Sequence, residues 1–266
     1  DQLDSSIAAL SGGGFVAAWQ STVQDNGNPG FYAQLYDPSG TAVGIEFKIN
    51  SETTNFLAAA GTSNMYMNSL NAETTKQGFF ISSLSDDRFV AAWPSIDTNG
   101  EHNGIFAQIF NADGTEIGSE FQINTYNGHV GYTGLHKWSP KITPLPDGGF
   151  AAVWGSGDNE QAGPGQNIFG QRFSAAGAKI GEEFHVDSGV DDGCHQTFPS
   201  VSASKDGKLI VTWQSSHGQD GDGEGVFAQI FDTGTSSSSG SSSGSSSNTT
   251  VSSSSSSSSS SGPTLD

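Results

Sequence analysis

Cysteine, basic residues and long apolar runs are all scarce in this 266-residue chain. Cys194 is the only cysteine, which excludes an internal disulfide and a cysteine-based zinc site. Nine lysines and arginines face 28 aspartates and glutamates, and the net charge of −19 repels nucleic-acid phosphates and anionic membranes. Because no run of about 18 apolar residues occurs, we expect neither a membrane-spanning segment nor a nucleic-acid partner.

Glycine and phenylalanine are abundant instead, with 36 and 17 copies, whereas charged residues make up only 14% of the chain. This composition is typical of a secreted, glycine-punctuated β protein and not of a helical cytosolic enzyme. The sequence has no initiator Met and no signal-type apolar stretch, so we expect a processed product or a piece of a longer protein. We place it outside the cell or on the cell surface.

Three sequence blocks recur along residues 1–234. The first block ends in tryptophan, and its copies end at Trp19, Trp93, Trp154 and Trp213. The second block has a central glutamine, at Gln34, Gln108, Gln171 and Gln229. The third reads Glu-Phe-x-Ile/Val-Asn/Asp and occurs three times, at residues 46–50, 120–124 and 183–187.

Each repeat contains four short segments of alternating polarity, separated by Gly-, Asp- and Pro-containing turn signals. Four antiparallel strands in about 45 residues is the pattern of a propeller blade. We predict an all-β fold of four tandem four-stranded antiparallel repeats, β-propeller-like, whose Trp and Phe residues fill the core between blades. The repeats span about residues 1–51, 76–125, 136–188 and 195–234.

The fourth repeat is incomplete, because no Glu-Phe-x-Ile-Asn block follows Phe231. One strand is therefore expected to be missing, which leaves an open sheet edge that another chain or a continuation of this one could complete. Segments 52–80 and 126–141 are predicted to be insertions between blades. The first is rich in apolar residues and predicts either a loop folded back on the blades or a contact with another subunit.

Residues 235–266 are rich in serine and cannot build a core. A flexible linker is one interpretation, and a glycosylated stalk is the other. The candidate glycosylation sites are Asn248, Thr249, Thr250, Ser252, Ser253, Ser254, Ser255 and Ser256.

The third repeat carries the motif most completely, through Asp147 to Phe150, Trp154, Gln171 and Glu183-Phe184. This pattern resembles a tandem repeat of large secreted bacterial adhesin-like and haemolysin-type surface proteins. The combination of four repeats with a serine-rich segment resembles, more loosely, subunits of glycan-coated extracellular filaments. The resemblance implies adhesion or scaffolding and not catalysis.

Loops between the first and second blocks are rich in Asp, Asn and Gly. Asp220, Asp222 and Glu224 come closest to the alternating carboxylates of a calcium loop, although the same residue types also build ordinary hairpin turns. Calcium is thus an alternative to simple turn formation, and no cofactor is required.

No nucleophile elbow, phosphate-binding loop or dinucleotide fingerprint occurs. Carboxylates are too numerous for a glycosidase-type pair to be chosen among them. His136 and His195 occupy equivalent repeat positions and are predicted to pack at blade junctions. Cys194 and His195 are neighbours on a predicted strand and point to opposite faces, so Cys194 is expected to be unpaired or bonded between chains.

From these features we expect an extracellular structural or adhesive glycoprotein that is not an enzyme. It would be a subunit of a surface or filamentous assembly that binds other copies of itself through the open sheet edge or the apolar insertion. The alternative is a carbohydrate-binding lectin that uses the repeated Asp/Gly loops and has glycans as partners. An extracellular enzyme such as a glycosidase is the least favoured interpretation.

Overall fold

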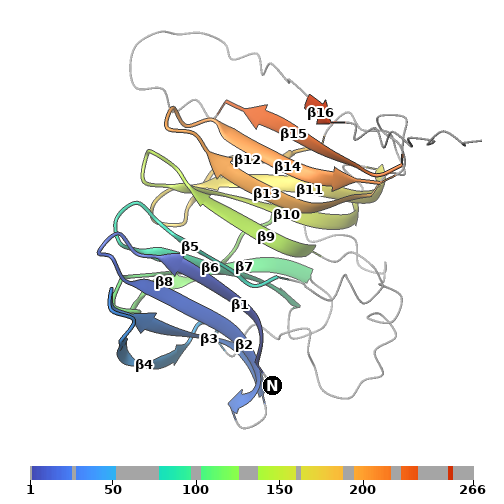
Figure 1. Cartoon of the computed structure of the whole chain (residues 1–266). Coiled ribbons are helices and arrows are strands. Elements are labelled where there is room, and N and C mark those ends of the chain that lie inside the picture. The colour runs from blue at the N-terminus through green and yellow to red at the C-terminus, as the bar shows by residue number, and fades with distance from the viewer. Residues whose placement is uncertain are drawn as a thin grey trace, which may run out of the picture.

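The computed structural model describes residues 2–25, 28–51, 78–96, 103–125, 137–159, 163–187, 195–216, 223–232 and 251–253. These residues form four antiparallel four-stranded sheets, which follow one another in sequence order (Figure 1). The predicted all-β, propeller-like fold of four repeats is confirmed. The described residues include no helix that could cross a membrane.

Within each sheet the strands lie in sequence order. The first sheet contains β1 (Gln2–Ala9), β2 (Phe15–Asp25), β3 (Asn28–Tyr36) and β4 (Ala42–Lys48). The second contains β5 (Phe80–Ser83), β6 (Phe89–Ile96), β7 (Asn103–Phe110) and β8 (Glu116–Gln122). The third contains β9 (Lys137–Pro144), β10 (Phe150–Asn159), β11 (Gly163–Phe173) and β12 (Lys179–His185). The fourth contains β13 (Gln196–Ala203), β14 (Leu209–Ser215), β15 (Gly225–Phe231) and β16 (Val251–Ser253).

Tight turns close one end of every sheet, which we call the turn end. In the first sheet, for example, the Asp37 N–H donates to the Thr41 carbonyl at 2.9 Å, and the Asp37 carboxylate accepts from the Ser39 hydroxyl at 2.6 Å. This hydroxyl, together with backbone N–H groups, holds the pKa of Asp37 below its usual 3.8. The opposite end, where first strands begin and second strands end, is called the loop end.

Three hydrophobic cores lie between successive sheets, because alternate residues of each second strand point to opposite faces. In the core between the first and second sheets, Val16 and Ala18 of β2 pack with Phe89 and Trp93 of β6. The next two cores repeat this arrangement. In the second core Val90 and Ala92 pack with Phe150 and Trp154. Between the third and fourth sheets Val153 packs with Val211 and Trp213, and Ala151 packs with Leu209.

The backbones of successive sheets approach one another most closely at their first strands, β1 with β5, β5 with β9 and β9 with β13. The sheets therefore spread outward from these strands, and much of the fourth strand β4 is exposed. Strand β13 makes no comparable approach to β1. The described residues thus form an open arc of four blades and not a closed ring.

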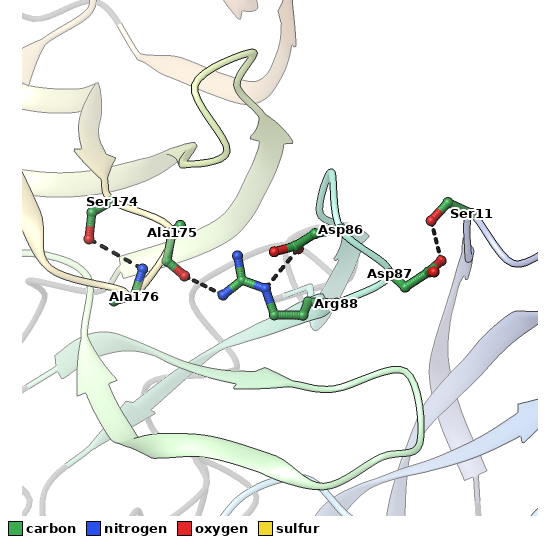
Figure 2. Close-up of polar contacts among 7 residues, drawn as sticks. All are labelled: Ser11, Asp86, Asp87, Arg88, Ser174, Ala175 and Ala176. Carbon is green, nitrogen blue, oxygen red and sulfur yellow. Dashed lines mark hydrogen bonds and ion pairs between the residues drawn. The ribbon is translucent and has the colours of Figure 1, made fainter.

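Polar contacts at the turn end connect the second sheet to both of its neighbours (Figure 2). Asp87, in the turn before β6, accepts a hydrogen bond from the Ser11 hydroxyl of the first sheet. The adjacent Arg88 donates to the Ala175 carbonyl of the third sheet at 2.5 Å and pairs with Asp86 at 2.7 Å. One short turn therefore fixes the spacing of three sheets.

Two boundaries differ from the sequence prediction. The insertion expected at 52–80 ends earlier, because Phe79 is buried in the first core and stacks on Phe31 with ring centroids 4.8 Å apart. Likewise residues 137–141, expected within an insertion, belong to β9. The apolar residues 52–77 lie outside the described part of the chain.

The fourth sheet lacks the Glu-Phe-x-Ile-Asn block, but the strand that was predicted to be missing from it is present. Its fourth position is filled by β16, a three-residue strand of the serine-rich segment, in which Val251 pairs with Ala228. This strand contains no aromatic residue. The last sheet therefore has a fourth strand that pairs only with residues 226–228 of β15 and lacks the Phe of the other three fourth strands.

Candidate functional site

The third sheet differs from the other three at the loop end. In those sheets the serine that follows the tryptophan block pairs with a glycine, in the pairs Ser21–Gly30, Ser95–Gly104 and Ser215–Gly225. In the third sheet Ser156 instead pairs with Asn167 on one side and with Lys137 on the other. Since the four repeats share one fold, a polar row found in a single copy is not required by that fold.

Lys137 begins β9 and is 2% exposed. Its Nζ donates to the Ser156 Oγ at 2.5 Å, and the Ser156 side chain is completely buried. Burial lowers the pKa of Lys137 to about 8, an effect that the charge of Glu183 partly offsets. A lysine that loses its proton near neutral pH can activate a serine hydroxyl, but a buried hydroxyl cannot reach a substrate. In this arrangement the pair fixes β9 to β10.

A histidine–aspartate pair, His185 and Asp187, lies at the end of β12. The Asp187 Oδ1 accepts the backbone N–H of Ile168 at 3.0 Å, and its side chain is buried. The equivalent residues Asn50 and Asn124 accept the N–H groups of the equivalent residues in their own sheets at 2.8 and 2.7 Å. The backbone bond is thus common to the three sheets, while the carboxylate is particular to the third.

The imidazole of His185 lies against the carboxylate of Asp187, although its Nε2 makes no hydrogen bond of regular geometry within the described part of the chain. The His185 Nε2 lies 2.7 Å from the Asp187 Oδ1, and the ring stacks on Phe169 with centroids 4.9 Å apart and planes 13° apart. The His185 side chain remains 25% exposed, whereas that of Asp187 is not exposed. An imidazole oriented by a buried carboxylate and open to solvent can transfer protons to a bound molecule.

In each sheet a residue with left-handed backbone lies within or just before the first strand, near the loop end. These residues lie three positions before Ile7, Ile81, Ile142 and Val201, and they are Asp4, Gly78, Ser139 and Phe198. Phe198 has φ +52° and a side chain that is 55% exposed. An exposed aromatic ring on an innermost strand offers a flat surface for a sugar.

The residues predicted as a calcium loop are only partly described. Asp220 and Asp222 lie outside the described residues, and Glu224 is exposed, with an oxygen that accepts from the Gln214 amide at 2.7 Å. Within the described ranges, no three His, Cys, Asp or Glu side chains come close enough together to hold a metal ion. The calcium hypothesis stays a prediction.

The other predicted positions also lie partly inside and partly outside the described residues. Of the glycosylation candidates, Ser252 and Ser253 belong to β16, whereas 248–250 and 254–256 lie outside the described residues. Cys194 and His136 also lie outside them. His195 is exposed where the third and fourth sheets meet, and its backbone pairs with Gln166.

The sequence prediction did not identify His185 and Asp187 as a site. A signal for them was nevertheless present in the aligned third block, which reads Glu-Phe-Lys-Ile-Asn, Glu-Phe-Gln-Ile-Asn and Glu-Phe-His-Val-Asp. Two positions that are neutral or basic in two copies become a His and an Asp in the third. The spacing of two residues places both on one face of a strand, where they can meet.

Comparison with known proteins adds information about the fold. No protein-family model matches the chain, and no curated protein sequence matches it either. Among solved structures, it is similar to an α-L-arabinofuranosidase of Fusarium graminearum in complex with an iminosugar inhibitor, with a TM-score of 0.58 and 11% identity. An α-L-arabinanase of Penicillium chrysogenum complexed with arabinobiose gives a TM-score of 0.53 and 13% identity. A protein of unknown function from Dyadobacter fermentans gives 0.53 and 12%.

The chain spans about three fifths of the length of the arabinofuranosidase and the arabinanase, since the similarity covers 86% of this chain and 62% of each of theirs. At such low identity the likeness shows the fold alone.

These findings correct the predicted identity and function. The resemblance to adhesin-like and haemolysin-type repeats is wrong, because the structural neighbours are arabinofuranosidase- and arabinanase-type propellers. The expectation of a structural or adhesive glycoprotein, a filament subunit without enzymatic activity, is contradicted by the same neighbours, whose names are those of enzymes. The repeat pattern misled because it reports how blades pack, and that packing is common to proteins of many functions.

Proposed function

We propose that the chain belongs to an extracellular carbohydrate-active enzyme of β-propeller fold that hydrolyses glycosidic bonds, with arabinose-containing glycans as the first substrate class to test. The fold likeness to an arabinofuranosidase and an arabinanase supports the class of activity. The single observation that carries the proposal is the His185–Asp187 pair at the loop end, an oriented imidazole present in only one of the blades.

Hydrolysis of a glycoside needs one group to give a proton to the leaving oxygen and another to assist the incoming water or to bond the sugar carbon. Because the His185 Nε2 is buried beside the Asp187 carboxylate, we assign the proton exchange with the substrate to the other ring nitrogen, Nδ1. The second function is left unassigned, because the contacts of the His185 side chain are those with Asp187 and Phe169. Glu224 and Phe198, both exposed near the loop end of the fourth sheet, are further side chains to substitute in the assay.

The test is an assay of the purified chain on a panel of arabino-oligosaccharides and other plant and microbial glycans, followed by variants of the pair. The double variant His185→Gln, Asp187→Asn places in the third sheet the two residues that the second sheet has at the equivalent positions, Gln122 and Asn124. The third sheet should therefore keep its packing. We expect this double variant to lose about 100-fold or more in kcat, since it cannot transfer a proton.

The matched control is Gln122→Ala, at the position of the second sheet equivalent to His185, which should leave kcat unchanged. Failure to cleave any glycan of the panel contradicts the proposal. A double variant that retains full activity also contradicts it. A third contradicting result is that the chain binds glycans without cleaving them and that the double variant binds them equally well.

A further inference from the structure

A phenylalanine in the fourth strand of each of the first three sheets packs into the sheet that follows. Phe47 of the first sheet lies 5.7 Å, centroid to centroid, from Phe110 of the second. Phe121 lies 5.7 Å from Phe173 of the third, and Phe184 lies 5.1 Å from Phe231 of the fourth. The same contact, made three times, is a standard element of the joint between successive blades.

The receiving side of this joint has two recurring parts. One is a stacked aromatic pair, Phe89–Phe110 in the second sheet, with ring centroids 5.0 Å apart. The other is a turn glycine with φ +83°, Gly114, which lies so close to Phe47 that a Cβ on it would be 2.9 Å from a ring carbon. The third sheet repeats both parts around Phe121. We call the aromatic pair and the turn glycine together the Phe socket.

The first sheet also has a Phe socket. Phe15 and Tyr36 stack with centroids 4.8 Å apart and planes 12° apart, and Gly40 has φ +83°, as Gly114 does. No atom lies within 4 Å of a Cβ built on Gly40. Phe15 and Tyr36 are only half-buried, whereas Phe89 and Phe110 are completely buried. Among the described residues this socket is built but empty.

Within the part of the chain that the structure describes, a glutamate of the receiving sheet also contacts the preceding repeat in the second and third sheets but not in the first. Glu120 accepts hydrogen bonds from the N–H and the hydroxyl of Ser51, at the end of the preceding repeat. Glu183 accepts the N–H of Thr125 at 2.7 Å in the same way. Glu46 occupies the equivalent position in the first sheet, where it is exposed and has no such donor among the described residues.

The fourth sheet of the same chain, or of a second copy, cannot fill the socket. Its fourth strand β16 reads Val-Ser-Ser and carries no phenylalanine. The solved structures that share the fold extend well beyond the part that this chain covers.

We propose that the outer face of the first sheet, formed by Phe15, Trp19, Tyr36, Gly40 and Glu46, is a docking surface for a further β-sheet unit of this repeat type. The partner inserts the Phe of its Glu-Phe-x-Ile/Val-Asn/Asp strand into the socket, and the backbone N–H that follows this strand donates to Glu46. The proposal concerns assembly and is independent of the hydrolytic activity.

The experiment supplies such a unit to the full chain. Residues 78–136, the second repeat with its own connector, are joined to Gln2, which stands at the position of Lys137 in the repeat. We expect Tm to rise by about 5 °C or more. We also expect the Trp19 fluorescence, obtained as the difference from a Trp19→Phe variant, to become less accessible to acrylamide.

Two substitutions distinguish docking from simple lengthening. Phe121→Ala in the added unit should remove most of the Tm rise. Since this variant could also unfold the added unit, Glu46→Ala provides the second test, because it changes an exposed side chain of the receiving sheet. It should leave Tm of the original chain unchanged and lower Tm of the fusion.

An unchanged Trp19 accessibility in the fusion overturns the proposal. Equal effects of Glu46→Ala in both proteins overturn it as well. Analytical ultracentrifugation of the original chain provides a last check, because dimers in which Trp19 is protected would place a second copy on this face and contradict the proposed partner.

Discussion

The four repeats are nearly alike at the turn end of the sheets and differ from one another at the loop end. At the turn end the four repeats use nearly the same turns, and polar contacts such as Asp87 with Ser11 hold neighbouring sheets at a fixed spacing (Figure 2). At the loop end the third sheet alone carries Lys137, Asn167 and the His185–Asp187 pair. The comparison teaches that features shared by the repeats serve packing, whereas a departure confined to one copy identifies a candidate for function.

The largest expected effect concerns the shared core. Phe150 is completely buried and stacks on Phe173 at 4.9 Å, so Phe150→Ala should lower the free energy of unfolding by about 3–5 kcal/mol. The equivalent Phe15→Ala should cost about 1 kcal/mol, because Phe15 is only half-buried on the outer face. Urea unfolding measures both. Equal losses would show that the contribution of this phenylalanine to stability does not depend on which sheet it belongs to.

The next prediction concerns placing the His–Asp pair of the third sheet at the equivalent positions of the second sheet. Asn124→Asp places a buried carboxylate beside Gln122, which carries no charge, and should cost about 2–3 kcal/mol in the free energy of unfolding. Adding Gln122→His should recover part of this loss, because it recreates the partner that Asp187 has. If the double variant is no more stable than the single one, the imidazole does not stabilise the carboxylate.

A smaller effect is expected at Lys137, where the sign depends on pH. Its folded pKa of about 8 lies below the unfolded 10.5, so the unfolded chain binds the proton more strongly. The cost of burying the charge is fully present below pH 8, and stability should rise from pH 8 to 10.5. Lys137→Met should add about 1–2 kcal/mol at pH 7 and abolish this rise. Unfolding curves at pH 7, 9 and 10 test it, with Lys208→Met, an exposed lysine, as control.

The smallest effects come from the turn aspartates. Hydroxyl and backbone hydrogen bonds lower the pKa values of Asp37 and Asp113 below 3.8, with Ser39 and Thr115 as the main donors. Their stabilisation is present above the unfolded pKa and is lost as pH falls through the folded value. Thermal melts between pH 5 and 2 should therefore show a shallower decline for Asp113→Asn than for the original chain. A parallel decline would mean that this turn does not contribute.

Much of the fold could be predicted from the sequence, because strands, turns and alternation are local. The four tryptophan blocks indicated the second strands, and the glycine- and Asp-containing turns indicated where they begin. The boundaries at 78–80 and 137–141 were missed, since neither short segment shows a clear alternation and only packing against a neighbouring sheet makes it a strand. The absence of activity was predicted wrongly, because the repeated residues determine how the sheets pack and carry no information about catalysis.

The candidate site was harder to predict for a physical reason. Lys137 and Ser156 are 19 residues apart, and only the pairing of β9 with β10 brings the amine to the hydroxyl. His185 and Asp187 are close in sequence, yet their significance depends on burial of the carboxylate and on stacking against Phe169.

By itself the amino-acid sequence determined the number of repeats, the two faces of each strand and the positions of the turns, because these follow from periodicity along the chain. Only the tertiary structure decided which faces are covered and which are left open. The same alternating pattern buries Phe89 and Phe150 but leaves Phe15 half-exposed, since burial depends on whether a neighbouring sheet is present and not on the residue.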